Sequence, residues 1–224
     1  MPLEKPSETM KNEICKIINK IGALQFGVFK LANGRTSPYY VDLRIVPSFP
    51  DAFQKICDFY SNFIKDNIGL KSFERIAGIT VAGIPFASQI AHSLKKPFLY
   101  VPEAVRLHGR QRRVEGILVS GERVLIIDDL ITTGLTLRKA ATAITYEGGV
   151  VNEAVVLLDR EEGGKEELER KGIRLHALIK VSEIANSLYE IGAIDEEQLK
   201  IVLKQIKRDK KSEKRVMKLT RCYS

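Results

Sequence analysis

The sequence has few of the residues that build metal centres or disulfide frameworks. Its 224 residues include three cysteines and three histidines. The cysteines, at positions 15, 57 and 222, lack the spacing of a metal site or a redox motif, and an odd number does not complete a disulfide framework. The histidines, at positions 92, 108 and 176, form no HExxH-type cluster, so the sequence gives no sign of a zinc site.

Long apolar runs are also missing. No stretch approaches the ~18 apolar residues needed to span a bilayer, and residues 1–13 lack the apolar core of a signal peptide. Hydrophobic residues nevertheless make up 44% of the chain, a composition typical of a globular protein with a full core. These features predict a cytoplasmic protein that has no membrane partner.

Positive charge is plentiful but lies mostly at one end of the chain. The formal net charge is +8, and residues 204–221, with nine basic and two acidic side chains, contribute +7 of it. We therefore divide the chain into a domain of residues 1–203 and a basic C-terminal tail of residues 204–224. A solvated tail is the simplest interpretation. Nucleic-acid contact by the tail is less favoured, because the rest of the chain offers no basic face studded with aromatic residues.

Two kinds of apolar pattern alternate along the chain. Helical spacing predicts helices near residues 11–21, 51–67, 86–94, from 137 onward, and near 165–171, 182–188 and 195–206. Short apolar runs predict strands at 75–79, 97–101, 124–127, 150–158 and 173–179. This alternation predicts an α/β fold with a mainly parallel sheet flanked by helices. Ahead of it, runs at 26–31 and 36–44 flank an Asn-Gly turn and predict a hairpin.

The segment Arg123–Ala140 carries the clearest sign of chemistry. An apolar run ends in two adjacent carboxylates, Asp128 and Asp129, and a Thr-Thr-Gly-Leu-Thr loop then leads into a helix. Amides and hydroxyls in such a unit can bind a phosphate, and Gly134 lets the backbone approach it. The carboxylates would repel that phosphate, so they should face a metal ion, sugar hydroxyls or a developing positive charge. The plain alternative is an acidic turn before a capped helix. No Walker loop is present, because the sequence lacks Gly-Lys-Ser/Thr.

A second small-residue turn, residues 80–85, also joins a predicted strand to a helix. Taken alone it could be an ordinary turn, but it can also form an anion-binding nest. The carboxyl ends of parallel strands share one edge of a sheet, where ligands bind. We therefore expect this turn, the loop after Asp129, and Arg160 at the end of the run 150–158 to face one site. Two nests suit a substrate with phosphates at both ends.

Together these motifs resemble the type I phosphoribosyltransferases, which bind 5-phosphoribosyl-1-pyrophosphate (PRPP). RVLIIDDLITTGLT resembles the signature of that family, and AGITVAGIPFASQIA resembles its pyrophosphate loop. FKLANGRTSPYYVDLR and VVLLDREEGG point to the orotate phosphoribosyltransferases, whose N-terminal hood corresponds to residues of about 21–47 here. The resemblance extends from about residue 14 to residue 206.

Residues 102–116 stand where that family has a mobile catalytic loop. His108-Gly109 and Glu115-Gly116 match the loop pattern, whereas Pro102 and Glu103 replace the usual Arg-Lys pair and Arg106 replaces the catalytic lysine. Ala32 likewise replaces a lysine that many members carry in the hood. In the family the loop reaches into the neighbouring subunit, so the resemblance implies a homodimer with shared active sites.

The resemblance implies the transfer of a phosphoribosyl group from PRPP to orotate with Mg²⁺, a step of pyrimidine (UMP) biosynthesis that yields orotidine 5′-monophosphate and pyrophosphate. The implied catalytic residues are Asp128, Asp129, Arg106 and His108. The implied PRPP-binding residues are Asp128, Asp129, Leu130, Ile131, Thr132, Thr133, Gly134, Leu135, Thr136, Gly83, Arg106 and His108. The implied orotate-binding residues are Thr132, Arg160 and Tyr40. We expect Mg²⁺ to bind through PRPP oxygens and water, without a dedicated protein ligand.

Two alternatives follow from the departures. Ala32 and the altered loop would fit a phosphoribosyltransferase for another nucleobase. The loop and the basic tail would fit a non-catalytic regulator that binds PRPP.

Overall fold

A computed structural model describes residues 6–30, 36–103 and 112–221, without the side chains of residues 209–221. Its centre is a five-stranded parallel sheet in the order β4-β3-β5-β6-β7. The strands are β3 (Arg75–Ile79), β4 (Phe98–Val101), β5 (Arg123–Ile131), β6 (Val150–Asp159) and β7 (Arg174–Lys180). The predicted α/β fold with a parallel sheet is thus confirmed. The apolar runs were recognisable because central parallel strands are buried on both faces.

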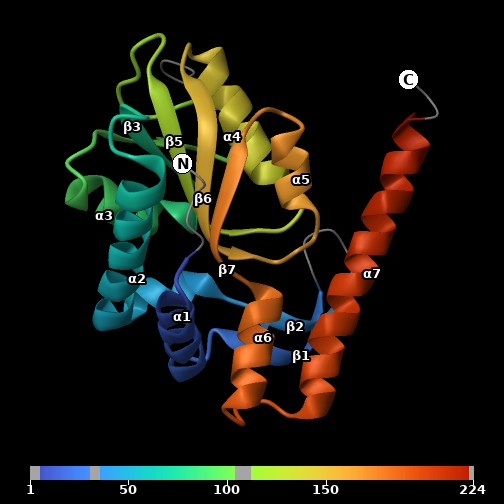
Figure 1. Ribbon diagram of the computed structural model, residues 1–224. Coiled ribbons are helices and arrows are strands. Elements are labelled where there is room, and N and C mark those ends of the chain that lie inside the picture. Colours follow the sequence, from blue (N-terminus) through green and yellow to red (C-terminus); the bar gives the residue numbers. More distant parts are fainter. Residues whose placement is uncertain (1–5, 31–35, 104–111, 222–224) are drawn as a thin grey trace.

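Helices cover the two faces of the sheet (Figure 1). One face carries α2 (Pro50–Phe63) and α3 (Gly83–Ser93), and the other carries α4 (Leu135–Tyr146) and α5 (Gly164–Glu169). Successive residues of β5 serve opposite cores, because strand side chains alternate between faces: Leu125 and Ile127 pack in one buried cluster, and Val124 and Ile126 pack in the other. Both faces of the sheet are therefore packed against helices, and the ends of its strands position the loops.

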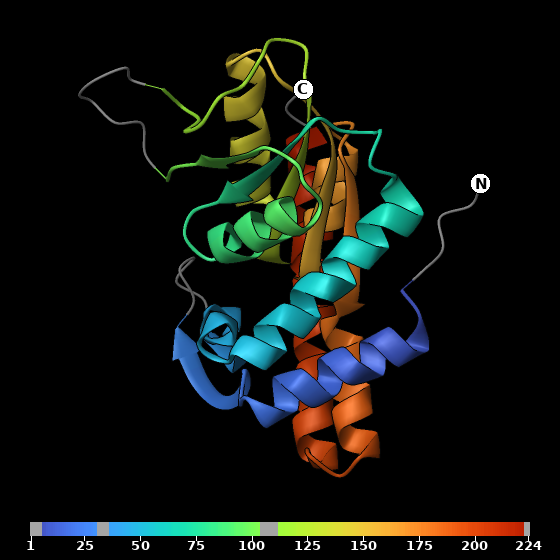
Figure 2. The same ribbon diagram turned by 90° about the vertical axis from the view of Figure 1, so that its left-hand side faces the viewer.

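The first of these clusters extends beyond the sheet. It includes residues of α1 (Glu8–Lys20), α6 (Val181–Glu190) and α7 (Glu196–Arg221). Figure 2 shows α1 and α2 lying across this side of the molecule. None of the helices in the described ranges is long and apolar enough to cross a membrane.

The hairpin forms as predicted, with somewhat different bounds. β1 (Leu24–Lys30) pairs antiparallel with β2 (Thr36–Val41). The second strand ends three residues before Arg44, where it was predicted to end, because the carboxylate of Asp42 accepts a hydrogen bond from the amide of Arg44 and starts the 3₁₀-helix η1 (Leu43–Ser48). This turn directs Arg44 away from the hairpin ladder.

The helices also begin or end away from their predicted bounds. The helix predicted over 51–67 is α2 followed by the π-helix η2 (Ile64–Ile68), and α3 begins at Gly83 rather than at Phe86. The last helix, predicted to end at residue 206, is α7 and continues to Arg221, across the division drawn from charge. Residues beyond 206 include many Lys and Arg, which favour helix without any apolar stripe to reveal it. The role of this tail as a partner site stays a prediction.

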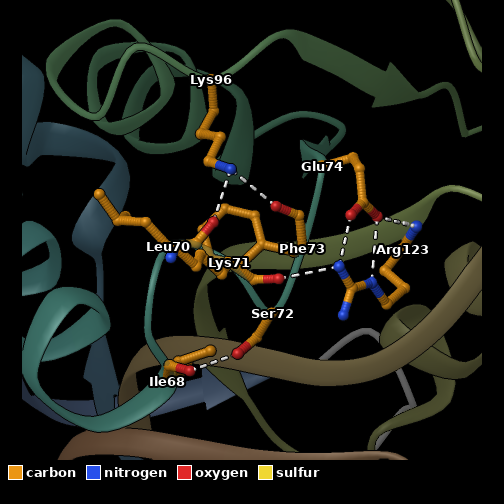
Figure 3. A network of polar contacts seen from close by, with 8 residues as sticks. All are labelled: Ile68, Leu70, Lys71, Ser72, Phe73, Glu74, Lys96 and Arg123. Carbon is orange, nitrogen blue, oxygen red and sulfur yellow. Dashed lines mark hydrogen bonds and ion pairs between the residues drawn. The ribbon is translucent and has the colours of Figure 1, made fainter.

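Side chains anchor the loop between η2 and β3 (Figure 3). The ammonium of Lys96 donates to the carbonyls of Leu70 and Phe73, at 2.6 and 2.8 Å, and lies 4.8 Å from the centre of the Phe73 ring. Arg123, the first residue of β5, donates to the carbonyl of Lys71 at 2.8 Å and pairs with Glu74. These contacts fix the amino ends of β3 and β5, opposite the edge where ligands bind.

Candidate active site

The two predicted anion loops meet at the carboxyl edge of the sheet. β3 and β5 are hydrogen-bonded neighbours, with Gly78 opposite Ile127, so the loops that follow them lie side by side. They enclose a cavity of about 200 Å³. Its walls are Thr80, Val81 and Ala82 from the first loop, and Asp128, Asp129, Leu130, Ile131, Thr132, Gly134, Leu135, Thr136 and Leu137 from the second.

The second loop delivers the start of α4 to this cavity. Gly134, the residue before the helix, has φ of +79°, in the left-handed region that glycine adopts without strain. The amides of the first helical turn have no partners within the helix, and Thr133 and Thr136 are exposed beside them. This geometry suits a phosphate group, because it combines free N–H donors with the positive end of the helix dipole.

The acidic pair lines this cavity and is largely buried. Asp128 and Asp129 are each only 8% exposed. The amide of Asp129 donates to Oδ1 of Asp128 at 3.0 Å, and the hydroxyl of Tyr60 donates to the carbonyl of Asp128 at 2.7 Å. Burial, followed by repulsion from Asp129, raises the pKa of Asp128 well above its usual value. Burial also raises the pKa of Asp129, and the nearby positive charge of Arg44 opposes that rise.

Gly83 allows the first loop to pack directly on the acidic pair. A Cβ atom at this position would lie 2.6 Å from Oδ1 of Asp128 and 3.0 Å from the carbonyl oxygen of Ile127. No other residue fits here without a shift, so the start of α3 and the carboxylate of Asp128 set each other's position. The two loops therefore form one interlocked unit.

The turn after β6 is hydrogen-bonded to the second of these loops, which we call the phosphate loop. The amide of Arg160 donates to the carbonyl of Ile131 at 3.0 Å, and the amide of Gly164 donates to the carbonyl of Thr132 at 2.9 Å. A Cβ on Gly164 would lie 2.5 Å from that same Thr132 oxygen, and one on Gly134 would lie 3.0 Å from the carbonyl oxygen of Gly164. Glycines at these two positions let the loops pack backbone against backbone.

Arg160 is more buried than a residue at an open edge would be. Its side chain is 4% exposed, and Nε lies 2.9 Å from Oε1 of Glu162, which is almost as buried. The guanidinium carbon lies 5.1 Å from the centre of the Tyr39 ring, which comes from the hairpin. Within the described residues, the buried Nη2 of Arg160 has no hydrogen-bond partner. Such a donor is rare unless a ligand or water completes it.

The hairpin brings further side chains toward the site. The ring of Tyr40 stacks on Phe29 with centroids 5.4 Å apart, and its hydroxyl accepts a hydrogen bond from Nη2 of Arg44 at 2.9 Å. The motif that singled out Tyr40 also contains Tyr39 and Arg44, but it gave no sign of their contacts. Tyr60 fitted only the apolar stripe of its helix, so nothing in the sequence revealed its bond to Asp128. Arg106 and His108 lie outside the described residues.

Comparisons with known proteins agree on one family. Residues 50–173 match the phosphoribosyl transferase domain. The orotate phosphoribosyltransferase of Cenarchaeum symbiosum is 40% identical over 177 residues, which are 79% of this chain and 88% of that protein. The one of Staphylothermus marinus is 38% identical over 206 residues, 92% of this chain and 99% of that protein. The crystal structure of orotate phosphoribosyltransferase from Aeropyrum pernix superposes on this chain with a TM-score of 0.66 at 31% identity. The superposition covers 80% of this chain and 99% of that one.

Proposed function

The chain belongs to the orotate phosphoribosyltransferases, and from this premise we propose how its residues share the work of the reaction. Its activity is the transfer of a phosphoribosyl group to orotate in pyrimidine biosynthesis. The observation that carries the residue assignment is the junction of two anion-binding loops above a buried pair of carboxylates. Binding and orientation of the reactants then supply much of the rate enhancement.

The loop Thr132–Thr136 and the start of α4 bind the 5′-phosphate of PRPP in this proposal. The left-handed backbone at Gly134 and the exposed threonine hydroxyls support it. A helix N-terminus attracts a dianion through its free amides and its dipole. Leu130, Ile131 and Leu135 contribute backbone and packing to the same loop.

Asp128 and Asp129 bind the ribose hydroxyls, and their charge supports a positive charge that develops at the ribose C1. Burial disfavours ionised carboxylates, so both pKa values are raised in the free protein. Hydroxyl donors from the sugar favour the ionised form. Substrate binding would therefore favour the negatively charged form at the place where the transition state needs it.

Pyrophosphate and Mg²⁺ belong beside the turn 80–83. Members of this family typically use Mg²⁺, a hard cation that prefers oxygen ligands and retains several waters. The buried carboxylates of Asp128 and Asp129 are the matching donor type. In this proposal the ion is held mainly by PRPP oxygens and water. Such an ion would neutralise the leaving pyrophosphate.

Orotate binds between the hairpin and the turn after β6. The unpartnered Nη2 of Arg160 suits a carboxylate oxygen of the base, because Arg–carboxylate bonds are short and strong. We assign the Tyr40 ring to the base as well, from the hairpin, and Thr132 lies where the phosphate loop joins this turn. The orotate ring is thereby held at a fixed distance from the 5′-phosphate.

Arg106 and His108 complete the site from a neighbouring subunit, so the working form is a homodimer. A guanidinium at position 106 neutralises pyrophosphate but does not donate a proton at working pH. We place the enzyme in the cytoplasm. The free, buried thiols of Cys15 and Cys57 fit a reducing compartment.

The test is orotate consumption with PRPP and Mg²⁺, followed by absorbance. We expect turnover of ~1 s⁻¹ or more, the usual range for enzymes. Asp129→Asn should lower kcat sharply, while its thermal unfolding midpoint stays near that of the wild type. A variant that kept the wild-type kcat would refute the assignment of Asp129 to the ribose.

A further inference from the structure

We propose that Arg44 binds the pyrophosphate group of PRPP, as an anion-binding residue additional to the turn 80–83 and the catalytic loop. This inference rests on the proposed function, because it assigns a new residue to the same substrate. Arg44 stands directly after the hairpin, in η1. Four observations support it: its neighbours in the cavity, the contact of η1 with β5, its orientation and its exposure.

Arg44 lines the same large cavity as the pyrophosphate turn. This cavity, of about 1230 Å³, has Arg44 on its wall together with Thr80, Val81 and Ala82. The same three turn residues also line the small cavity above the acidic pair. A group held between the two cavities would therefore contact the turn on one side and meet Arg44 on the other.

Arg44 lies close to the strand that carries the acidic pair. The 3₁₀-helix η1, in which Arg44 stands, contacts β5, which contains Asp128 and Asp129. In the proposed site Asp129 binds the ribose, and the pyrophosphate is attached to the same ribose at C1. A cation close to Asp129 and to the turn 80–82 is thus near both ends of the bond that joins ribose to pyrophosphate.

Neighbouring side chains hold the Arg44 guanidinium in one orientation. Asp42 accepts from Nε at 2.7 Å and from Nη2 at 2.9 Å, and Tyr40 accepts from Nη2 at 2.9 Å. Among the described residues, no hydrogen bond involves Nη1. The side chain is 58% exposed, so this nitrogen is accessible to a ligand. A guanidinium oriented in advance loses less conformational entropy when it binds an anion.

Other anionic groups of the reactants have other partners nearby. The 5′-phosphate lies at the start of α4 in the proposed site, and the orotate carboxylate lies at Arg160, beneath the hairpin. Two other arginines of the large cavity are already engaged, since Arg138 pairs with Glu167 at 3.1 Å and Arg113 stacks on Tyr146 at 3.9 Å. Pyrophosphate is the group that matches the position of Arg44.

The experiment compares two ligands that differ only in this group. Calorimetry would measure the Kd of PRPP and of ribose 5-phosphate, both with Mg²⁺, for wild type, Arg44→Ala and Arg44→Lys. We expect Arg44→Ala to weaken PRPP binding by about 10-fold to 100-fold, the usual range for a charged hydrogen bond, and to leave the Kd of ribose 5-phosphate unchanged. Arg44→Lys keeps the positive charge but cannot form both hydrogen bonds to Asp42 that orient the guanidinium. Its Kd for PRPP should therefore fall between those of the wild type and Arg44→Ala.

Arg174→Ala is the matched control. Arg174 is equally exposed and also pairs with a carboxylate, that of Glu153, but it begins β7 at the opposite edge of the sheet. Its loss should change neither Kd. Equal weakening of both ligands by Arg44→Ala or Arg44→Lys would show that Arg44 only supports the hairpin, and unchanged PRPP binding would also overturn the proposal. Orotate turnover by the wild type tests the proposed function separately.

Discussion

Replacing Gly83 with alanine should damage catalysis through the position of Asp128. The added methyl group would lie 2.6 Å from Oδ1 of Asp128, whereas ordinary contact begins at 3.4 Å. Either the carboxylate or the start of α3 must therefore move by about 0.8 Å. The carbonyl of Ile127, at 3.0 Å, blocks an easy escape on the strand side. Overpacking of this kind costs about 1–3 kcal/mol of unfolding free energy.

The effect on rate should exceed the effect on stability. A displacement approaching 1 Å in a catalytic group can cost about 100-fold, so we expect kcat to fall by between about 10-fold and 100-fold. The assay is orotate consumption at saturating PRPP and Mg²⁺, with urea unfolding measured in parallel. The reasoning would be refuted by a folded Gly83→Ala variant that retains the wild-type kcat.

Gly192→Ala provides the control for this experiment. Gly192 follows α6, has φ of +70°, and has nothing within 4 Å of an added Cβ. Its substitution should lower the unfolding free energy by about 1 kcal/mol through backbone strain and leave kcat unchanged. A loss of kcat in this variant would mean that stability alone explains the Gly83 result.

Three further predictions concern other parts of the molecule. Arg160→Ala should raise the KM for orotate more than the KM for PRPP in steady-state assays, and equal changes would remove its role in binding the base. The buried Asp128 has a pKa above its usual 3.8, so the folded protein binds more protons than the unfolded chain and loses stability as pH rises through the folded pKa. Asp128→Asn should reduce this loss in urea unfolding between pH 4 and 8, leaving the part due to Asp129; a parallel pH dependence in both proteins would contradict it. Lys96→Met should leave the carbonyls of Leu70 and Phe73 without their donor and lower the unfolding free energy by about 1–3 kcal/mol; an unchanged denaturation midpoint would show that water replaces the ammonium.

Most of the sheet could be predicted from the sequence because its strands are short apolar runs. β3, most of β5 and the second half of β6 are buried on both faces, so these runs are apolar without alternation. The sequence also predicted that the two anion loops share one edge of the sheet, since the carboxyl ends of parallel strands lie together. The two anion loops therefore meet in the structure as the sequence predicted. The family comparisons then favour orotate over another base, and an enzyme over a regulator.

The remaining features depend on contacts between distant segments. The burial of Arg160 requires the hairpin residue Tyr39 to pack over it, and no local pattern encodes that approach. The sequence suggested that Gly83 is a loop glycine beside an anion, whereas Gly83 begins α3 and a Cβ there would lie closest to the Asp128 carboxylate of β5. The position of Arg44 follows from a turn that Asp42 starts two residues earlier.

The close glycine contact between the phosphate loop and the turn after β6 fixes the distance between these two segments. The two segments share hydrogen bonds through Ile131 and Thr132 and touch at Gly134 and Gly164, so neither can move without the other. In the proposed site, the place where the base is recognised therefore lies at one set distance from the bound 5′-phosphate. A nucleotide with a longer or shorter sugar would satisfy one end and miss the other. On this assignment the enzyme would select its substrate by length as well as by chemical group.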